Sequence, residues 1–241
     1  MDGFEGYVGI PLWDGQQVDD VVFALLCGLS FCFALVFRGH YRLFVKMLRD
    51  VVYVKERQSI FETRDGNEAF FRTFMTSQAL FLCALCLFSI ARIQGYLNHM
   101  NDRIILISIV LIFFMLVLFY QFKQAFYYLF GLVFTDPAKY KFWKTGYNAI
   151  MGTWGISLYL PALWLAFVGE HVEIPMVLFM VFYILCRIVI IYKTIRIFQR
   201  KSNGFLYISL YLCGQELMPL IMLYKGVDYL YNFIESGTLW H

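Results

Sequence analysis

The sequence predicts an all-α integral membrane protein, a single domain built as a bundle of six transmembrane helices. Of its 241 residues, 61% are hydrophobic and only 15% are charged, whereas soluble domains are nearer half apolar and a quarter charged. Aromatic residues make up 20% of the chain, which is typical of helices that face acyl chains and end in interfacial belts. The net charge of +3 comes without the clustered basic face of a soluble nucleic-acid-binding module. We therefore expect the protein to contact the lipid bilayer and not nucleic acid.

Six apolar runs are long enough to cross a hydrocarbon layer about 30 Å thick, since a helix rises about 1.5 Å per residue. The predicted spans cover about residues 18–37, 73–97, 104–133, 146–169, 175–192 and 205–224. Residues 1–18 hold no Lys or Arg and no small-residue cleavage site, so they do not read as a secretory signal. The first run is therefore expected to be retained as a helix.

The first connector, residues 38–72, contains the pattern of a basic amphipathic helix. Apolar residues recur at helical spacing between positions 44 and 52, while Arg42, Lys46 and Arg49 line another face. Such helices lie on membrane surfaces. The basic face is a candidate contact for anionic lipid or for a partner, and the alternative is a helix that only lines the inner rim of the bundle.

The third span and the connector after it leave one choice open. The purely apolar part ends at Tyr120, and Gln121, Lys123 and Gln124 precede a further apolar tail. That tail either continues the helix at a tilt or turns along the interface. Residues 134–145 then read as a helix stop followed by a basic interfacial loop.

The fourth span carries a predicted helix-packing face. Small and polar residues fall at helical spacing there, and small residues allow helices to approach closely. This face consists of Asn148, Gly152, Gly155 and Tyr159. Pro161 leaves the carbonyl of Ser157 without its helical donor, so a kink is expected.

The distribution of basic residues predicts the orientation. Connectors 38–72, 134–145 and 193–204 hold 15 of the 20 Lys and Arg residues, whereas the termini and the other two connectors hold only Arg103 and Lys225. By the positive-inside rule, the three basic connectors are cytoplasmic and both termini lie outside.

The last span is the strongest candidate for a functional site. Gln215, Glu216 and Pro219 lie near its middle, where an ionisable group costs on the order of 2.5–3.5 kcal/mol to insert. Arg187 in the fifth span is the expected counter-charge; its alternative is to extend to the cytoplasmic headgroups. The site binds an ion or a proton, or it is a polar packing and docking point, and we favour the second.

Other chemistry finds little support in the sequence. There is no P-loop, no Rossmann glycine pattern, and neither HExxH nor GxSxG. Cys83 and Cys86 have the spacing of a redox or metal pair, but inside an apolar helix they read as small buried hydrophobes. We therefore expect no catalytic residue, no metal site and no cofactor.

Two segments resemble a known family. Residues 205–220 (FLYISLYLCGQELMPL), followed by Tyr224 and Lys225, resemble the closing signature of a Bacteroidota membrane family, domain of unknown function 4271. Residues 147–152 (YNAIMG), with Pro161 later in the helix, are similar to the family's fourth-helix pattern. The resemblance implies the inner membrane of a Bacteroidota cell, and it implies no chemistry.

The sequence therefore favours a non-catalytic subunit or assembly factor of a bacterial envelope complex, with other membrane-protein subunits as partners. The main alternative is a small transporter or ion-coupled carrier that uses Glu216 with Arg187. A weaker one is a membrane enzyme that acts on lipid and holds phosphate with its basic connectors.

Topology is the first prediction to test. Single cysteines placed at positions 58, 99 and 171 are expected to differ in their reaction with a membrane-impermeant maleimide in intact cells. Positions 99 and 171 lie outside and label, whereas position 58 is cytoplasmic and labels only after permeabilisation. A cytoplasmic position 171 would overturn this orientation.

Overall fold

The computed structural model describes residues 15–52, 66–95, 102–134, 137–167 and 172–198, together with Lys225. Over these ranges the fold is all-helical, as predicted, and contains no strand. The helices are α1 (Gln16–Val52), α2 (Gly66–Ile93), α3 (Asp102–Phe134), α4 (Pro137–Ser157), α5 (Tyr159–Phe167) and α6 (Glu173–Phe198). The predicted sixth span, residues 205–224, lies outside the described residues.

Five stretches of this bundle are long and apolar enough to cross a membrane. They are Gln16–Val51, Gly66–Ile93, Asp102–Leu129, Phe142–Phe167 and Glu173–Ile197. The fourth combines α4 and α5, so these stretches correspond to the first five predicted spans. Their length and apolar composition support the prediction of a membrane protein, while the sixth span and the orientation stay predictions.

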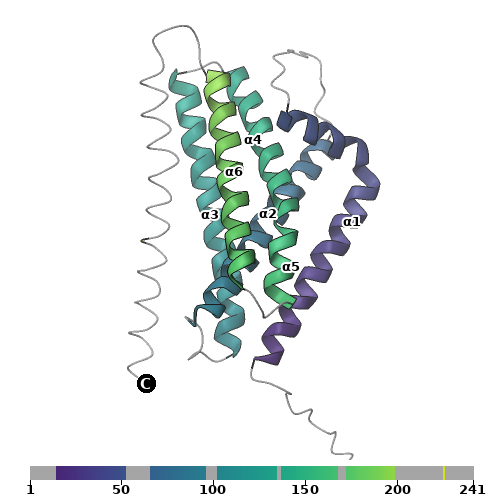
Figure 1. The fold of residues 1–241 in the computed structure, drawn as a ribbon. Helices are drawn as coiled ribbons and strands as arrows, with labels where there is room; N and C mark the ends of the chain where they lie inside the picture. Colours follow the sequence, from purple (N-terminus) through teal and green to yellow (C-terminus); the bar gives the residue numbers. More distant parts are fainter. Residues whose placement is uncertain are drawn as a thin grey trace, which may run out of the picture.

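The centre of the bundle is formed by α2 and by α4 with α5. Along the most apolar stretches, 61% of the residues of α2 and 50% of those of α4–α5 are buried, against less than a quarter in α1, α3 and α6. The outer helices pack against these two: α3 contacts α2 and α4, while α6 contacts α4 and α5. In Figure 1, α3, α6 and α4 stand side by side, and α1 leans away toward its upper end. Lipid-facing helices therefore surround a buried pair.

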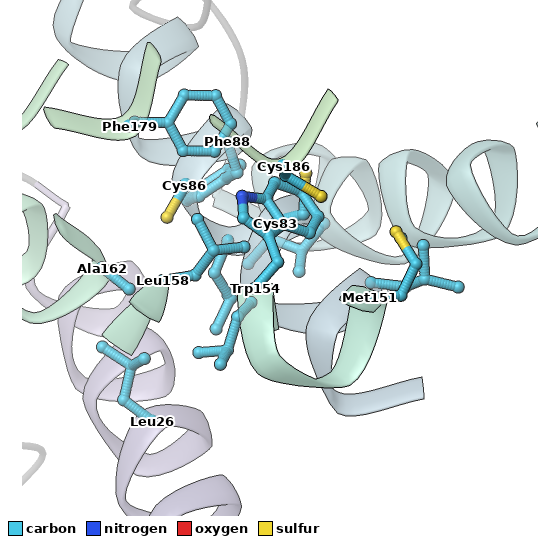
Figure 2. Close-up of a cluster of buried hydrophobic side chains, with 14 of the residues drawn as sticks. Leu26, Cys83, Cys86, Phe88, Met151, Trp154, Leu158, Ala162, Phe179 and Cys186 are labelled. Atoms are coloured by element: carbon cyan, nitrogen blue, oxygen red, sulfur yellow. The ribbon is translucent and has the colours of Figure 1, made fainter. Parts of the chain in front are cut away.

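The core contains side chains from most of the described helices (Figure 2). Leu26 comes from α1, Cys83 and Cys86 from α2, Trp154 from α4 and Cys186 from α6, and all five are buried. The three cysteines are free thiols in an apolar cluster. Their surroundings support the interpretation of Cys83 and Cys86 as buried hydrophobes.

Several helix boundaries differ from the predicted ones. The first span is predicted to end at 37 and to be followed by an amphipathic helix; the structure contains both within α1, on either side of the non-helical His40. The second begins at Gly66 rather than at 73 and ends at Ile93 rather than at 97. Gly95, with φ +85°, adopts the left-handed conformation that stops α2. The helices are longer at the basic end because their charged residues find partners there, as described below.

The connector predicted as a basic loop is also helical. The third helix continues unbroken to Phe134, and α4 begins at Pro137, since proline is suited to a first helical turn. Trp143 is only 2% exposed, so it belongs to the bundle interior and not to an interfacial loop. Helix α6, which corresponds to the predicted fifth span, likewise continues past the predicted end at residue 192 to Phe198.

Two bends shape the bundle. Between α4 and α5 the helix breaks at Leu158, where Pro161 predicts a kink, and the amide of Leu158 still donates to the Trp154 carbonyl at 3.1 Å. In α1 the bend is at His40, whose φ of −130° and ψ of 31° are not helical. Residues 41–52, which we call the surface segment, turn there over the end of the bundle where α2 and α4 begin (Figure 1). We call that end the rim.

Small residues allow α2 and α4 to pack closely. A Cβ atom added at Gly155 would lie 2.5 Å from the Cβ atom of Ala79 and 2.8 Å from its Cα atom. At Gly152 it would lie 3.0 Å from Sδ of Met47 and 3.1 Å from the Cβ atom of Met75. Close helix approach of this kind is the usual role of small residues in membrane bundles.

This contact gives a stability prediction. Gly155→Ala is expected to lower the free energy of unfolding in detergent by about 1–3 kcal/mol, because the added methyl group meets the backbone of α2. Gly28→Ala in α1 is the matched control, since a Cβ there meets nothing within 4 Å. The control should be neutral or slightly stabilising, and equal stability of both variants would contradict the close packing.

Candidate functional site

The sequence-predicted intramembrane site is only partly described. Gln215, Glu216 and Pro219 lie outside the described residues. Arg187 lies near the middle of α6, half-buried, with its guanidinium carbon 4.9 Å from the centre of the Tyr183 ring. That distance is within the range of a cation–π contact. The pairing of Arg187 with Glu216 stays a prediction.

A different charged site is built around Arg72 at the rim. Arg72 is only 7% exposed. Its Nε and Nη2 donate to Oε1 of Glu68 at 3.0 and 2.8 Å, and Nη2 also donates to Oδ2 of Asp50 at 2.8 Å. Its Nη1 donates to the carbonyl oxygen of Thr145 at 3.1 Å. One guanidinium therefore connects α1, α2 and α4.

Two lysines extend the cluster. Lys46 Nζ donates to Oε2 of Glu68 at 3.2 Å. Lys193, on α6 and 5% exposed, donates to the backbone carbonyl of Asp50. The last carbonyls of a helix lack intrahelical donors and attract cations, so Lys193 caps the end of α1. Lys46, Asp50, Glu68, Arg72 and Lys193 together form what we call the rim network.

The rim network explains why charge is tolerated here. A buried ion is costly unless an opposite charge and further hydrogen bonds compensate it. Three cations share two carboxylates and two carbonyl oxygens, and Asp50 and Glu68 keep partial exposure, with side chains 32% and 19% accessible. The result is a fixed junction of four helices.

The sequence-predicted contact residues separate into two groups at this junction. Arg42 and Arg49 are exposed, whereas Lys46 pairs with Glu68. On the opposite side of the surface segment, Met47 is buried against Phe71 of α2. The surface segment therefore lies on the bundle, with Arg42 and Arg49 directed to the exterior.

Beside the rim network, an aromatic group surrounds a buried lysine. Lys123 of α3 is 2% exposed, and its Nζ lies 5.9 and 5.7 Å from the ring centres of Tyr127 and Tyr147. Trp143 stacks on Tyr127 with ring centres 3.9 Å apart, and its Nε1 donates to Thr194 of α6 at 3.0 Å. Cation–π contacts stabilise a desolvated cation. This group joins α3, α4 and α6.

Neutral hydrogen bonds connect the helices elsewhere on the predicted packing face. The hydroxyl of Tyr120 donates to Oδ1 of Asn148 at 2.8 Å. The amide of Gln78 donates to the hydroxyl oxygen of Tyr159 at 2.6 Å. Together with the glycine contacts described above, each residue of the predicted face (Asn148, Gly152, Gly155 and Tyr159) meets a neighbouring helix.

At the opposite end of the bundle, one ion pair joins the start of α1 to the end of α2. Arg92 donates to Asp19, and its guanidinium also lies against Gly15. Over the described ranges, no group of three or more His, Cys, Asp or Glu side chains has the arrangement of a metal site.

The sequence pattern assigns Asp50, Glu68 and Arg72 to a polar connector and does not single them out. One signal does point to part of the network: Glu68 and Arg72 are four residues apart, the spacing of an ion pair on one helix face. The other partners are separated by 22 to 143 residues along the chain. Only the folded bundle brings them together.

Comparison with known proteins gives one match. A family model described as "Domain of unknown function (DUF4271)" matches residues 22–227, which confirms the resemblance drawn from the fourth and last helices. No curated protein and no solved structure matches the chain.

The rim network gives a second stability prediction. Arg72→Gln is expected to lower the free energy of unfolding by about 3 kcal/mol, because it leaves two partly buried carboxylates without their shared cation. The value lies at the low end for a buried pair since Asp50 is about one-third exposed. Thermal unfolding in detergent measures the loss.

Arg49→Gln is the control, because Arg49 is exposed on the same surface segment and such changes stay within about 0.5 kcal/mol. In a double-mutant cycle, Glu68→Gln and Arg72→Gln should be strongly non-additive. Additive effects would show that the ion pair contributes nothing to stability.

Proposed function

The chain belongs to the DUF4271 family, and we propose that it acts as a non-catalytic subunit or assembly factor of a bacterial envelope complex. In this proposal it lies in the inner membrane with both termini in the periplasm, and its partners are other membrane-protein subunits. The rim faces the cytoplasm, where the basic connectors gather.

One observation carries this proposal: Arg72, Lys193 and Trp143, all buried, each join different helices of the described bundle. Arg72 connects α2 to α1 and α4. Lys193 connects α6 to the end of α1, and Trp143 connects α4 to α6 through Thr194. A transport pathway needs polar groups that change partners, whereas a scaffold needs groups that hold one arrangement. The observed contacts favour the scaffold.

The surface segment is the contact surface that this function requires. Its apolar side is buried through Met47, and its position is fixed through Lys46 and Asp50. Arg42 and Arg49 remain exposed on it. A rigid element with exposed guanidinium groups binds carboxylates or phosphates with little loss of conformational entropy.

A small ion-coupled carrier is the second candidate, in which Glu216 works with Arg187. It is favoured by the burial of Lys123 and by the mid-helix position of Arg187, because ionisable side chains within spans often mark ion pathways. The two candidates differ in whether charge at Glu216 is needed.

Glu216→Gln distinguishes them, because it keeps the shape of the side chain and removes its charge. For a scaffold, we expect unchanged protein level, unchanged co-purifying subunits in mild detergent and unchanged growth of cells that depend on the protein. Loss of growth with the protein level and the complex intact would instead favour the carrier.

Charge reversal tests the contact surface. The double variant Arg42→Glu/Arg49→Glu is expected to reduce the recovery of co-purified subunits several-fold, measured by quantitative mass spectrometry. Arg103→Glu, an exposed position at the start of α3, is the control and should retain them. Purification of the natural chain without any stoichiometric partner would contradict the proposed function.

A further inference from the structure

The bend of α1 opens a cavity that the rim network does not fill. Its volume is about 490 Å³, and it is lined by residues 38–43 of α1 and by Asn67 and Glu68 of α2. Volumes of about 300–1,000 Å³ are typical of small-molecule sites. The cavity lies where the first span meets the surface segment, and therefore at the edge of the membrane.

The walls of this cavity carry excess positive charge. Arg38 and Arg42, four residues apart, both line it and are both exposed. Within the described part of the chain, neither guanidinium takes part in an ion pair. Glu68 is the one acidic residue of the lining, and its charge is already compensated by Arg72 and Lys46. The local field thus favours an anion.

His40 also lines the cavity, at the bend itself. Its Nδ1 donates to the carbonyl oxygen of Val36 at 3.3 Å, which orients the imidazole at the bend. The ring also lies beside Phe71, with ring centres 6.0 Å apart. Because Nδ1 carries the proton of the neutral ring, Nε2 is an acceptor, so His40 shapes the cavity and is not counted among the donors to an anion.

The first turn of α2 adds to this field. Asn67 and Glu68 belong to that turn, and the first amides of a helix have no intrahelical acceptor and favour negative charge. The cavity thus combines two guanidinium groups of α1 with the first turn of α2.

From this arrangement we propose that the cavity at the α1 bend binds a phosphate group through Arg38 and Arg42. Arginine forks match the oxygen atoms of phosphate in bidentate fashion. A phosphate at this level is carried by an anionic lipid headgroup or by a soluble phosphate compound, and the chemistry of recognition is the same. This binding does not depend on the proposed scaffold function, because it can be measured on the purified protein without any partner subunit.

The test uses delipidated protein in detergent and two probes. Native mass spectrometry measures the binding of phosphatidylglycerol against phosphatidylcholine, and thermal unfolding measures the effect of millimolar inorganic phosphate against chloride at equal ionic strength. The natural chain should prefer the anionic lipid, or be stabilised by phosphate, or both. The first result identifies a lipid headgroup and the second a soluble phosphate.

Arg38→Gln/Arg42→Gln is expected to weaken the binding of the responding probe about tenfold or more, since two charge-assisted hydrogen-bonding groups are lost. Arg49→Gln removes one positive charge from the surface segment outside the cavity lining and should keep binding. Arg38→Lys/Arg42→Lys keeps the charge and should bind with intermediate affinity.

Three results would overturn the proposal. They are equal binding of the two lipids together with no effect of phosphate, full binding by Arg38→Gln/Arg42→Gln, and an equal loss in Arg49→Gln. The last would assign the effect to overall surface charge. The melting temperature of each variant without ligand shows whether it is folded, and Arg38 and Arg42 are exposed, so their replacement should leave it unchanged.

Discussion

Burial of the Arg72 guanidinium is the constraint on which the rest of the bundle depends. A cation that is 7% exposed needs compensation on every side, and it obtains this from Glu68 on its own helix, Asp50 on α1 and the carbonyl of Thr145 on α4. Asp50 reaches Arg72 only if the surface segment returns over the bundle. The bend at His40 is therefore a requirement of the ion network, and the cavity beside it follows from the same bend.

Close packing of α2 against α4 makes this network possible. Gly155 allows contact with the backbone of Ala79, and the same two helices place Arg72 against Thr145 at the rim. The small residues thus set the spacing of the two helices that carry the network.

Features that depend on composition and local pattern could be predicted from the sequence. Long apolar runs predict the five long apolar stretches that the structure describes, and Pro161 predicts the break at Leu158. The amphipathic helix predicted in the first connector is present as the surface segment. The sequence did not reveal how this segment is attached to the bundle, because contacts such as Asp50 with Arg72 and Lys193 join residues that are distant in the chain. It also did not reveal the helical extensions of α2, α4 and α6 at the rim. A run with many charges reads as a solvated connector until its partners are known. The site in the last span lies outside the described residues and stays a prediction.

The kind of polar group in the bundle changes with its distance from the rim. At the rim, charged side chains form a network with partial access to water, which lowers the cost of desolvation. On the packing face between α2, α3, α4 and α5, neutral groups such as Gln78 with Tyr159 form the contacts, and these join helices without moving charge. Arg187 departs from this arrangement, since it lies near the middle of α6 against Tyr183. An anion at the same depth would lower the cost of holding this cation within the membrane, and for this reason Glu216 remains the residue whose charge decides between a scaffold and a carrier.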